Sequence, residues 1–101
     1  MKTSLTDTTL RVTFDGDLLS TNIDALRNEI LAAMAQHPSA QTIVADLTHS
    51  RLVDSKGVNL LIALYRETQN RKLSFRAENP TPDVRRLLGL LKLNERFGLT
   101  A

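Results

Sequence analysis

Three segments of the chain show the hydrophobic and polar spacing that is typical of β-strands. Apolar and polar residues alternate along 10–14 (LRVTF) and 73–77 (LSFRA), and a period of two predicts strands with one buried face. The run 42–47 (TIVADL) is a short apolar run, which indicates a central strand buried on both faces. Residues 1–9 are mostly polar, so we expect them to be loosely ordered or to form a first edge strand.

Three other segments place apolar residues three or four positions apart, as amphipathic helices do. These segments are 23–34, 58–65 and 84–91. Ser20 or Thr21 stands in the right place to cap the first of these helices, because a hydroxyl oxygen can accept a hydrogen bond from a free backbone N–H of the first turn.

The start of the third helix is marked by Thr81, a good N-cap residue, and by Pro82 at the first helical position. Strands and helices alternate along the chain, which implies at least partly parallel pairing in a sheet covered by helices. We expect the first strand to pair antiparallel with a neighbour on one side of Gly16. The expected fold is therefore α/β, with a mixed sheet of about four to five strands covered by about three to four helices.

Length and composition are those of one folded domain over residues 1–101. Hydrophobic residues make up 42% of the chain and charged residues 24%, which fits a globular protein and argues against disorder. There is no cysteine, so disulfides and thiolate metal sites are excluded. No signal peptide and no apolar run of roughly 18 residues is present. We therefore expect a cytoplasmic protein without membrane insertion.

Charge adds little to this picture. The formal net charge is +2 and aromatic residues make up 4% of the chain, whereas a nucleic-acid binder normally shows a basic stripe with aromatics among it. We therefore expect no nucleic-acid partner. Basic residues are dense around the third helix, where a solvated face is the simplest interpretation and a surface for an acidic partner is the alternative. These residues are Arg85, Arg86, Lys92 and Arg96.

Histidines offer no metal site. His37 and His49 are isolated, without a second histidine or a cysteine at ligand spacing. We expect both to be surface residues, and we expect the chain to need no metal and no cofactor.

The segment 53–58 (VDSKGV) is the best candidate for a functional site, because a short strand meets the start of a long helix there. Free N–H groups and the positive end of the helix dipole favour an anion at such a point. A phosphate on Ser55 would bring roughly −1.5 to −2 charges and three acceptor oxygens. The alternative is that Asp54 and Ser55 are only helix caps.

The stretch 43–65 (IVADLTHSRLVDSKGVNLLIALY) resembles the signature of the STAS domain, the family of anti-sigma factor antagonists. In that family a hydrophobic strand ends in Asp-Leu-(Ser/Thr), and hydrophobic-Asp-Ser-x-Gly and an apolar helix follow. Residues 46–48 and 53–57 match these two motifs. The segments 16–18, 79–88 and 90–97 also resemble family motifs, in the same order, so the resemblance covers roughly residues 10–99 and implies a STAS-like fold.

The resemblance implies a partner-switching protein and not an enzyme. The family's phospho-acceptor serine maps onto Ser55. The unphosphorylated protein would bind an anti-sigma factor that is also a serine kinase, phosphorylation would separate the two, and a phosphatase of the PP2C type would reverse the step. ATP and Mg²⁺ would belong to the kinase, and we expect this chain to be a monomer. The expected partner-binding residues are Asp17, Asp54, Ser55, Lys56, Gly57 and Asn59, and Asp46 and Thr48 are expected to support the loop.

Two departures from the family pattern bear on this interpretation. Lys56 replaces the small residue that usually stands between Ser and Gly, where it would pair with a phosphate, match an acidic patch on the kinase, or simply be solvated. The chain also ends soon after Phe97, so the final helix of longer members is short or absent. One alternative is a STAS subunit or scaffold that does not switch, in a lipid-transport or stress-signalling complex. The other alternative is a small enzyme, which is disfavoured because Ser55 has no base nearby in sequence.

Overall fold

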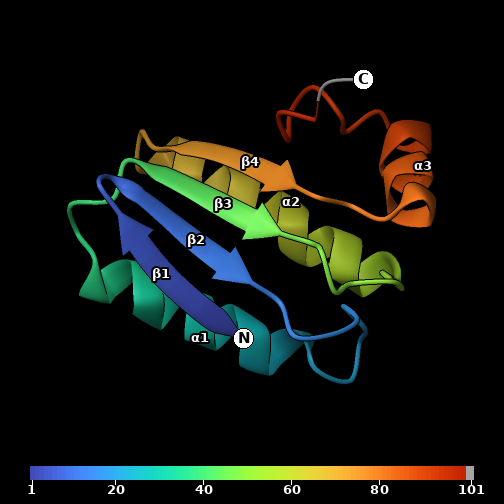
Figure 1. The fold of residues 1–101 in the computed structure, drawn as a ribbon, viewed down its shortest axis with the longest axis horizontal. Coiled ribbons are helices and arrows are strands. Elements are labelled where there is room, and N and C mark those ends of the chain that lie inside the picture. The colour runs from blue at the N-terminus through green and yellow to red at the C-terminus, as the bar shows by residue number, and fades with distance from the viewer. Residues whose placement is uncertain (100–101) are drawn as a thin grey trace.

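The computed structural model describes residues 1–99 and contains four strands and three helices (Figure 1). In chain order they are β1 (Lys2–Thr6), β2 (Thr9–Thr13), α1 (Ile23–Gln36), β3 (Thr42–Asp46), α2 (Ser55–Asn70), β4 (Ser74–Glu78) and α3 (Pro82–Leu90). The expected α/β fold is confirmed, with strand and helix numbers inside the expected ranges.

The strands form one mixed sheet in the order β1-β2-β3-β4. Strand β1 pairs antiparallel with β2, and β2–β3 and β3–β4 are parallel pairs. The antiparallel neighbour of β2 therefore comes before Gly16, and of the two expectations for residues 1–9 the edge strand is the correct one. All five residues of β1 are exposed, so backbone pairing and not burial holds this strand in place.

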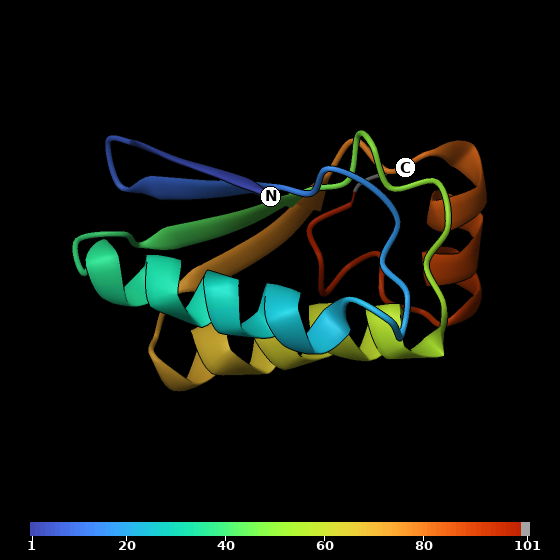
Figure 2. The same cartoon turned by 90° about the horizontal axis from the view of Figure 1, so that it is seen from below.

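Helices α1 and α2 lie side by side under one face of the sheet, while α3 stands at the end of the sheet where β3 and β4 finish (Figures 1 and 2). The inward side chains of β2 and β3 are almost fully buried between the sheet and these helices, because a sheet buries one face against a helical layer. The three phenylalanines Phe14, Phe75 and Phe97 all lie in this core, as their positions predict.

The C-terminal segment after α3 returns to the free edge of β4. The backbone N–H of Ala77 donates a hydrogen bond of 2.7 Å to the carbonyl oxygen of Phe97. The ring of Phe97 lies 5.4 Å from that of Phe75 in an edge-to-face arrangement. This segment therefore covers the edge of β4 and fixes the position of the chain that follows α3. No helix is assigned between Leu90 and the last described residue.

Helix caps match the prediction at α3 but not at α1. Thr81 caps α3, its hydroxyl accepting a hydrogen bond of 3.4 Å from the N–H of Val84. The expectation that Ser20 or Thr21 caps α1 is wrong: the N-cap is Asn22, and its side chain makes no cap hydrogen bond. Ser20 is engaged elsewhere, because its N–H donates to the carboxylate of Asp54 at 2.8 Å.

Candidate functional site

Ser55 is the first residue of α2, and Asp54 is the N-cap of that helix. The Oδ1 atom of Asp54 accepts a hydrogen bond of 2.8 Å from the N–H of Gly57. Ser55 is exposed, and no hydrogen bond of its hydroxyl is recorded within residues 1–99. Asp54 is thus a helix cap, whereas the Ser55 side chain has no structural partner in the described part of the chain.

The loop that contains Leu18 pairs with the loop that leads into α2, just before Ser55. Leu18 and Val53 form a parallel bridge, in which the N–H of Leu18 donates to Leu52 at 3.0 Å and the N–H of Asp54 donates to Leu18 at 3.1 Å. Gly57 faces this bridge, and a Cβ atom there would lie 2.9 Å from both the Cβ of Leu18 and the Cγ1 of Val53. Only glycine permits this close approach.

Asp17 lies in the same pair of loops, but its carboxylate bonds to the chain itself. Its Oδ1 atom accepts hydrogen bonds of 3.0 Å from the N–H groups of Arg51 and Leu52. The side-chain amide of Asn22 donates to the Asp17 carbonyl at 2.9 Å. Asp17 therefore holds the loop before Val53 in place, and the bridge between Leu18 and Val53 brings its loop next to that of Asp54.

The charge at the start of α2 is set by Asp54. Hydrogen bonds from the backbone of Gly57 and then of Ser20 lower the pKa of the Asp54 carboxyl, so this group is ionised at neutral pH. Lys56 follows Ser55, is exposed, and has no ion pair recorded in the described part of the chain. Ser55 therefore stands between a fixed carboxylate and an unpaired ammonium group.

Asp46 and Thr48 form a second polar group, at the end of β3. The Oδ1 atom of Asp46 accepts hydrogen bonds from the N–H (3.1 Å) and hydroxyl (2.5 Å) of Thr48, and from the side-chain amide of Asn79 (3.3 Å). Its Oδ2 atom pairs with Arg11 at 3.2 Å. Burial opposes ionisation of Asp46 most strongly, but these hydrogen bonds and the charge of Arg11 together lower its pKa.

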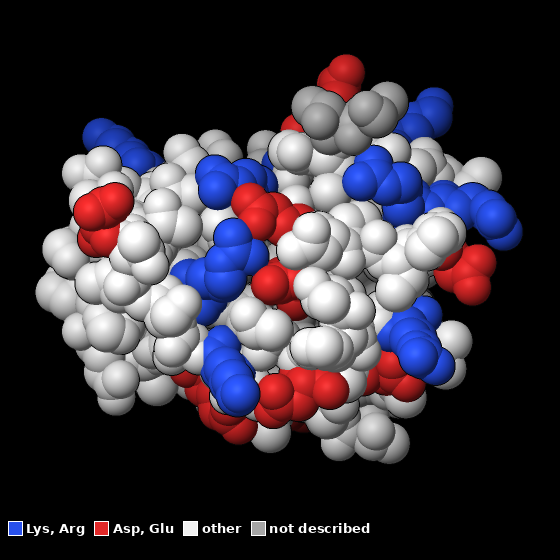
Figure 3. Space-filling view, in the orientation of Figure 1, with Lys and Arg blue, Asp and Glu red and all other residues white. Residues whose placement is uncertain are grey.

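Arg11 extends this group across the face of the sheet that no helix covers. It bonds to Glu78 at 2.6 Å, and Glu78 in turn pairs with Arg76 at 2.7 Å. Figure 3 shows this face, with acidic and basic side chains beside one another across its middle. Asp46 therefore links the loop before α2 to three neighbouring strands, which is a structural role.

A groove lies between the first turns of α2 and the segment around α3, with Ser55 on its rim. Its volume is about 540 Å³. Its lining is largely aliphatic and comes from two separate stretches of the chain, 53–62 and 87–96: Val53, Ser55, Val58, Asn59, Ile62, Leu87, Leu91, Leu93 and Arg96. Asn59, expected to contact a partner, is thus in the groove wall. No single sequence motif contains the walls of this groove, so the sequence does not predict it.

Ser50 is another residue that the sequence analysis missed. It is fully buried, and its hydroxyl donates a hydrogen bond of 2.8 Å to the carbonyl of Gly16. This bond adds to the bridge between the loop of Leu18 and the loop that leads into α2. A single serine in a polar connection carries no sequence signal for such a contact.

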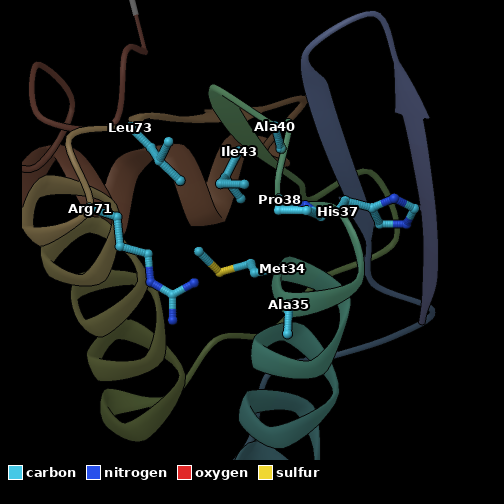
Figure 4. Close-up of a pocket in the computed structure, with 8 residues that line it drawn as sticks. All are labelled: Met34, Ala35, His37, Pro38, Ala40, Ile43, Arg71 and Leu73. Carbon is cyan, nitrogen blue, oxygen red and sulfur yellow. The ribbon is translucent and has the colours of Figure 1, made fainter.

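A second cavity, of about 290 Å³, lies at the opposite end of the fold (Figure 4). Met34, Ile43 and Leu73 point into it, and Arg71 reaches across its mouth from the end of α2 (Figure 4). It adjoins the beginning of β3, whereas Ser55 follows the end of that strand. This cavity is therefore separate from the Ser55 site. Within residues 1–99 no group of three or more potential metal ligands is found, and none of the described helices is long and apolar enough to cross a membrane.

Comparison with known proteins gives the family. A family model described as "Mlab, STAS domain" matches residues 1–100, and the chain therefore belongs to the STAS domain family. No curated protein sequence matches the chain.

Solved structures share the fold at low sequence identity. The anti-sigma factor antagonist SpoIIAA of Bacillus, in its unphosphorylated form, is 24% identical with a TM-score of 0.78, over 93% of this chain and 82% of that one. An anti-sigma factor antagonist from Mycobacterium paratuberculosis is 25% identical with a TM-score of 0.82, over 95% and 80%. The murine anion transporter Slc26a9 is 17% identical with a TM-score of 0.79, over 91% of this chain and 15% of that one. The chain thus has the fold of anti-sigma factor antagonists, a class that is typically not enzymatic.

Proposed function

We propose that this protein is a partner-switching anti-sigma factor antagonist controlled by phosphorylation of Ser55. Unphosphorylated, it binds an anti-sigma factor that is also a serine kinase, and phosphorylation releases it. A PP2C-type phosphatase restores the binding form. The observation that carries the proposal is the exposed hydroxyl of Ser55, which has no recorded bond within residues 1–99 and sits in the family's Asp-Ser-x-Gly motif.

The fold can hold a phosphate at this position. The Asp54 carboxylate accepts from the N–H of Gly57 at 2.8 Å and also interacts with the N–H of Lys56. In the described part of the chain this leaves the N–H of Ser55 for a phosphate, at the positive end of the α2 dipole. Repulsion from the Asp54 carboxylate opposes this, and the Lys56 ammonium offsets it. A partner packed over the start of α2 gains no such compensation, so the added charge weakens its binding.

The same geometry argues for an acceptor rather than a nucleophile. No base is hydrogen-bonded to the Ser55 hydroxyl among the described residues, and an activated serine needs one. The kinase then supplies ATP and Mg²⁺, and this chain acts without a cofactor, as a monomer, in the cytoplasm. The loops around Ser55 are held in place by hydrogen bonds of Asp17, Asp46 and Thr48. The partner contacts Lys56 and Asn59.

Intact mass tests the proposal directly. The protein is incubated with ATP and the candidate kinase encoded nearby, and Ser55→Ala is compared with Ser39→Ala, which removes another exposed serine. We expect one added phosphate on the wild type and on Ser39→Ala, and none on Ser55→Ala. If the kinase phosphorylates itself or another substrate but the mass of the wild type does not change, the proposed phosphorylation switch is wrong.

A second candidate is a STAS subunit that does not switch. The matching family model is described by the name Mlab and not by anti-sigma factors, and a similar fold forms 15% of an anion transporter. Such a subunit remains in its complex when ATP is added, and Ser55→Asp does not release it. Co-purification of tagged wild type and Ser55→Asp, with and without ATP, separates the two candidates.

A further inference from the structure

The groove beside Ser55 is largely aliphatic, and the described part of the chain leaves it uncovered. Four large hydrophobic side chains of residues 1–99 are exposed; one of them, Leu91, lines the groove, and Leu52 and Leu90 are next to groove residues in the sequence. Leu52 is 61% exposed and precedes the groove residue Val53, while Leu90 (75%) and Leu91 (48%) come from the end of α3. An aliphatic groove with exposed leucines next to its lining residues in the sequence is typical of an interaction surface.

The charge in the wall of the groove is basic, while its sequence neighbours carry both signs, with Asp54 and Glu95 as well as Lys56 and Lys92. Arg96 is the one charged side chain in its wall among the described residues. Lys56 and Lys92 adjoin groove residues in the sequence, and within residues 1–99 no ion pair is recorded for either of them or for Arg96. Figure 3 shows basic side chains gathered on the side of the molecule where Figure 1 places α3.

From these observations we infer that the groove is the docking site for a partner segment that is apolar on one face and acidic on the other. The proposal deepens the proposed function and rests on it in one respect, namely that this segment belongs to the protein released by Ser55 phosphorylation. Leucine-like side chains of the segment fill the space between α2 and α3, in the manner of a helix in a groove. A carboxylate of the segment pairs with Arg96.

The shape and charge of the surface select this occupant over others. A small molecule of the size of the groove would leave Leu52 and Leu90 exposed, so the occupant extends beyond the groove. A second copy of this chain would bring together two groove walls whose one charged side chain, among the described residues, is Arg96 in each, because a two-fold interface uses the same patch on both sides. A membrane surface would contact the protruding side chains Leu90 and Leu91 but would not enter a concave groove.

The position of Ser55 explains how its phosphorylation would release this segment. Ser55 and Arg96 line the same groove. A phosphate on Ser55 would add about −1.5 to −2 charges on the rim and would repel the acidic face of the segment. It would also compete for the guanidinium of Arg96, since phosphate and carboxylate use the same donors.

The test is a titration of the isotope-labelled full chain, followed by methyl and amide NMR. The probe is a synthetic helical peptide with leucines on one face and glutamates on the other, and its control carries lysines in place of the glutamates. Arg96→Glu is compared with Arg66→Glu, which reverses an exposed charge on α2 outside the groove. Anionic vesicles form a separate arm.

We expect the acidic peptide to shift the methyl signals of the groove wall, namely Val58, Ile62, Leu87, Leu91 and Leu93. Binding should weaken at least about tenfold in Arg96→Glu and for the lysine peptide, and should not change in Arg66→Glu. The inference is overturned if no groove signal shifts up to about 1 mM peptide, or if both peptides bind alike. It is also overturned if the groove signals depend on protein concentration alone, or respond to vesicles and not to peptide.

The outcomes remain distinct from those of the phosphorylation test, because the titration uses unphosphorylated protein. If the peptide binds the groove of Ser55→Ala but the kinase transfers no phosphate to the wild type, the docking site is supported and the phosphorylation switch is contradicted. If Ser55 is phosphorylated but no peptide binds the groove, the switch is supported and the docking site is contradicted.

Discussion

The carbonyl oxygen of Leu18 lies less than 3.0 Å from the position that a Cβ atom on Gly57 would occupy. The same oxygen accepts the hydrogen bond from the N–H of Asp54 at 3.1 Å. The turn around Leu18 therefore touches the first turn of α2 at a point that only glycine allows. This contact fixes where α2 begins, and with it the position of Ser55 relative to Asp17.

Replacing Gly57 by alanine should damage this contact. The added methyl group would meet a backbone oxygen, which cannot move as a flexible side chain can, so we expect a loss of about 1–3 kcal/mol in the free energy of unfolding. Urea denaturation followed by circular dichroism measures it. Gly16→Ala is the matched control, because nothing lies within 4 Å of a Cβ there. Equal stabilities of the two variants would contradict the close approach.

Ser55→Asp should be tolerated by the fold but not by the partner. A carboxylate in the first turn of a helix gains about 0.3–1 kcal/mol from the dipole, and repulsion from Asp54 cancels part of this gain. We therefore expect the free energy of unfolding to change by less than about 1 kcal/mol, while affinity for the kinase falls. Ser55→Ala should retain that affinity. Calorimetric titration and urea denaturation on the same samples measure both effects.

The specificity of that effect is checked with Gln69→Glu, which adds one negative charge near the other end of α2. It should leave kinase affinity unchanged. Equal affinities for the wild type, Ser55→Ala and Ser55→Asp would rule out control through this residue, and a loss of stability well above 1 kcal/mol in Ser55→Asp would show that the helix start does not accept charge.

Local patterns in the sequence were enough to predict β2, β3 and β4, the three helices and the cap of α3, because neighbours along the chain determine them. The cap of α1 was mispredicted because the helix begins only at Ile23, beyond the reach of a cap at Ser20, whose N–H bonds to Asp54, a residue 34 positions away. Strand β1 carries little hydrophobic pattern because it is held by pairing and is exposed. The groove could not be predicted at all, since its walls come from two segments that only the tertiary fold brings together.

The carboxylates of the sheet face should make stability depend on acid pH. The folded-state pKa of Asp46 is lowered, as is that of Glu78, chiefly by its bonds to Arg76 and Arg11. Groups with depressed pKa values stabilise the fold fully above their unfolded values, about 4. That stabilisation is lost as pH falls through the folded values. We therefore expect a steep loss of stability below about pH 4, measured by urea denaturation over a pH series.

Asp46→Asn tests whether the Asp46 carboxylate contributes to this loss of stability at acid pH. It keeps the size of the side chain but removes the charge that pairs with Arg11, so we expect a loss of about 1–2 kcal/mol at neutral pH and a shallower fall below about pH 4. Glu29→Gln, an exposed change on α1, should alter neither. An Asp46→Asn curve that runs parallel to the wild type would assign the acid sensitivity elsewhere.

The C-terminus of α2 should be stabilised by a glycine. Lys72 has a φ of 59°, and its N–H donates to Gln69 at 3.1 Å while that of Leu73 donates to Thr68 at 2.7 Å. This is the Schellman arrangement, in which glycine avoids the cost that a Cβ atom incurs in the left-handed region. We expect Lys72→Gly to raise the free energy of unfolding by about 0.5–1 kcal/mol, and Arg71→Gly, where φ is −90°, to lower it. If Lys72→Gly instead destabilises the protein in urea denaturation, the lysine side chain contributes more to this helix end than its backbone conformation costs.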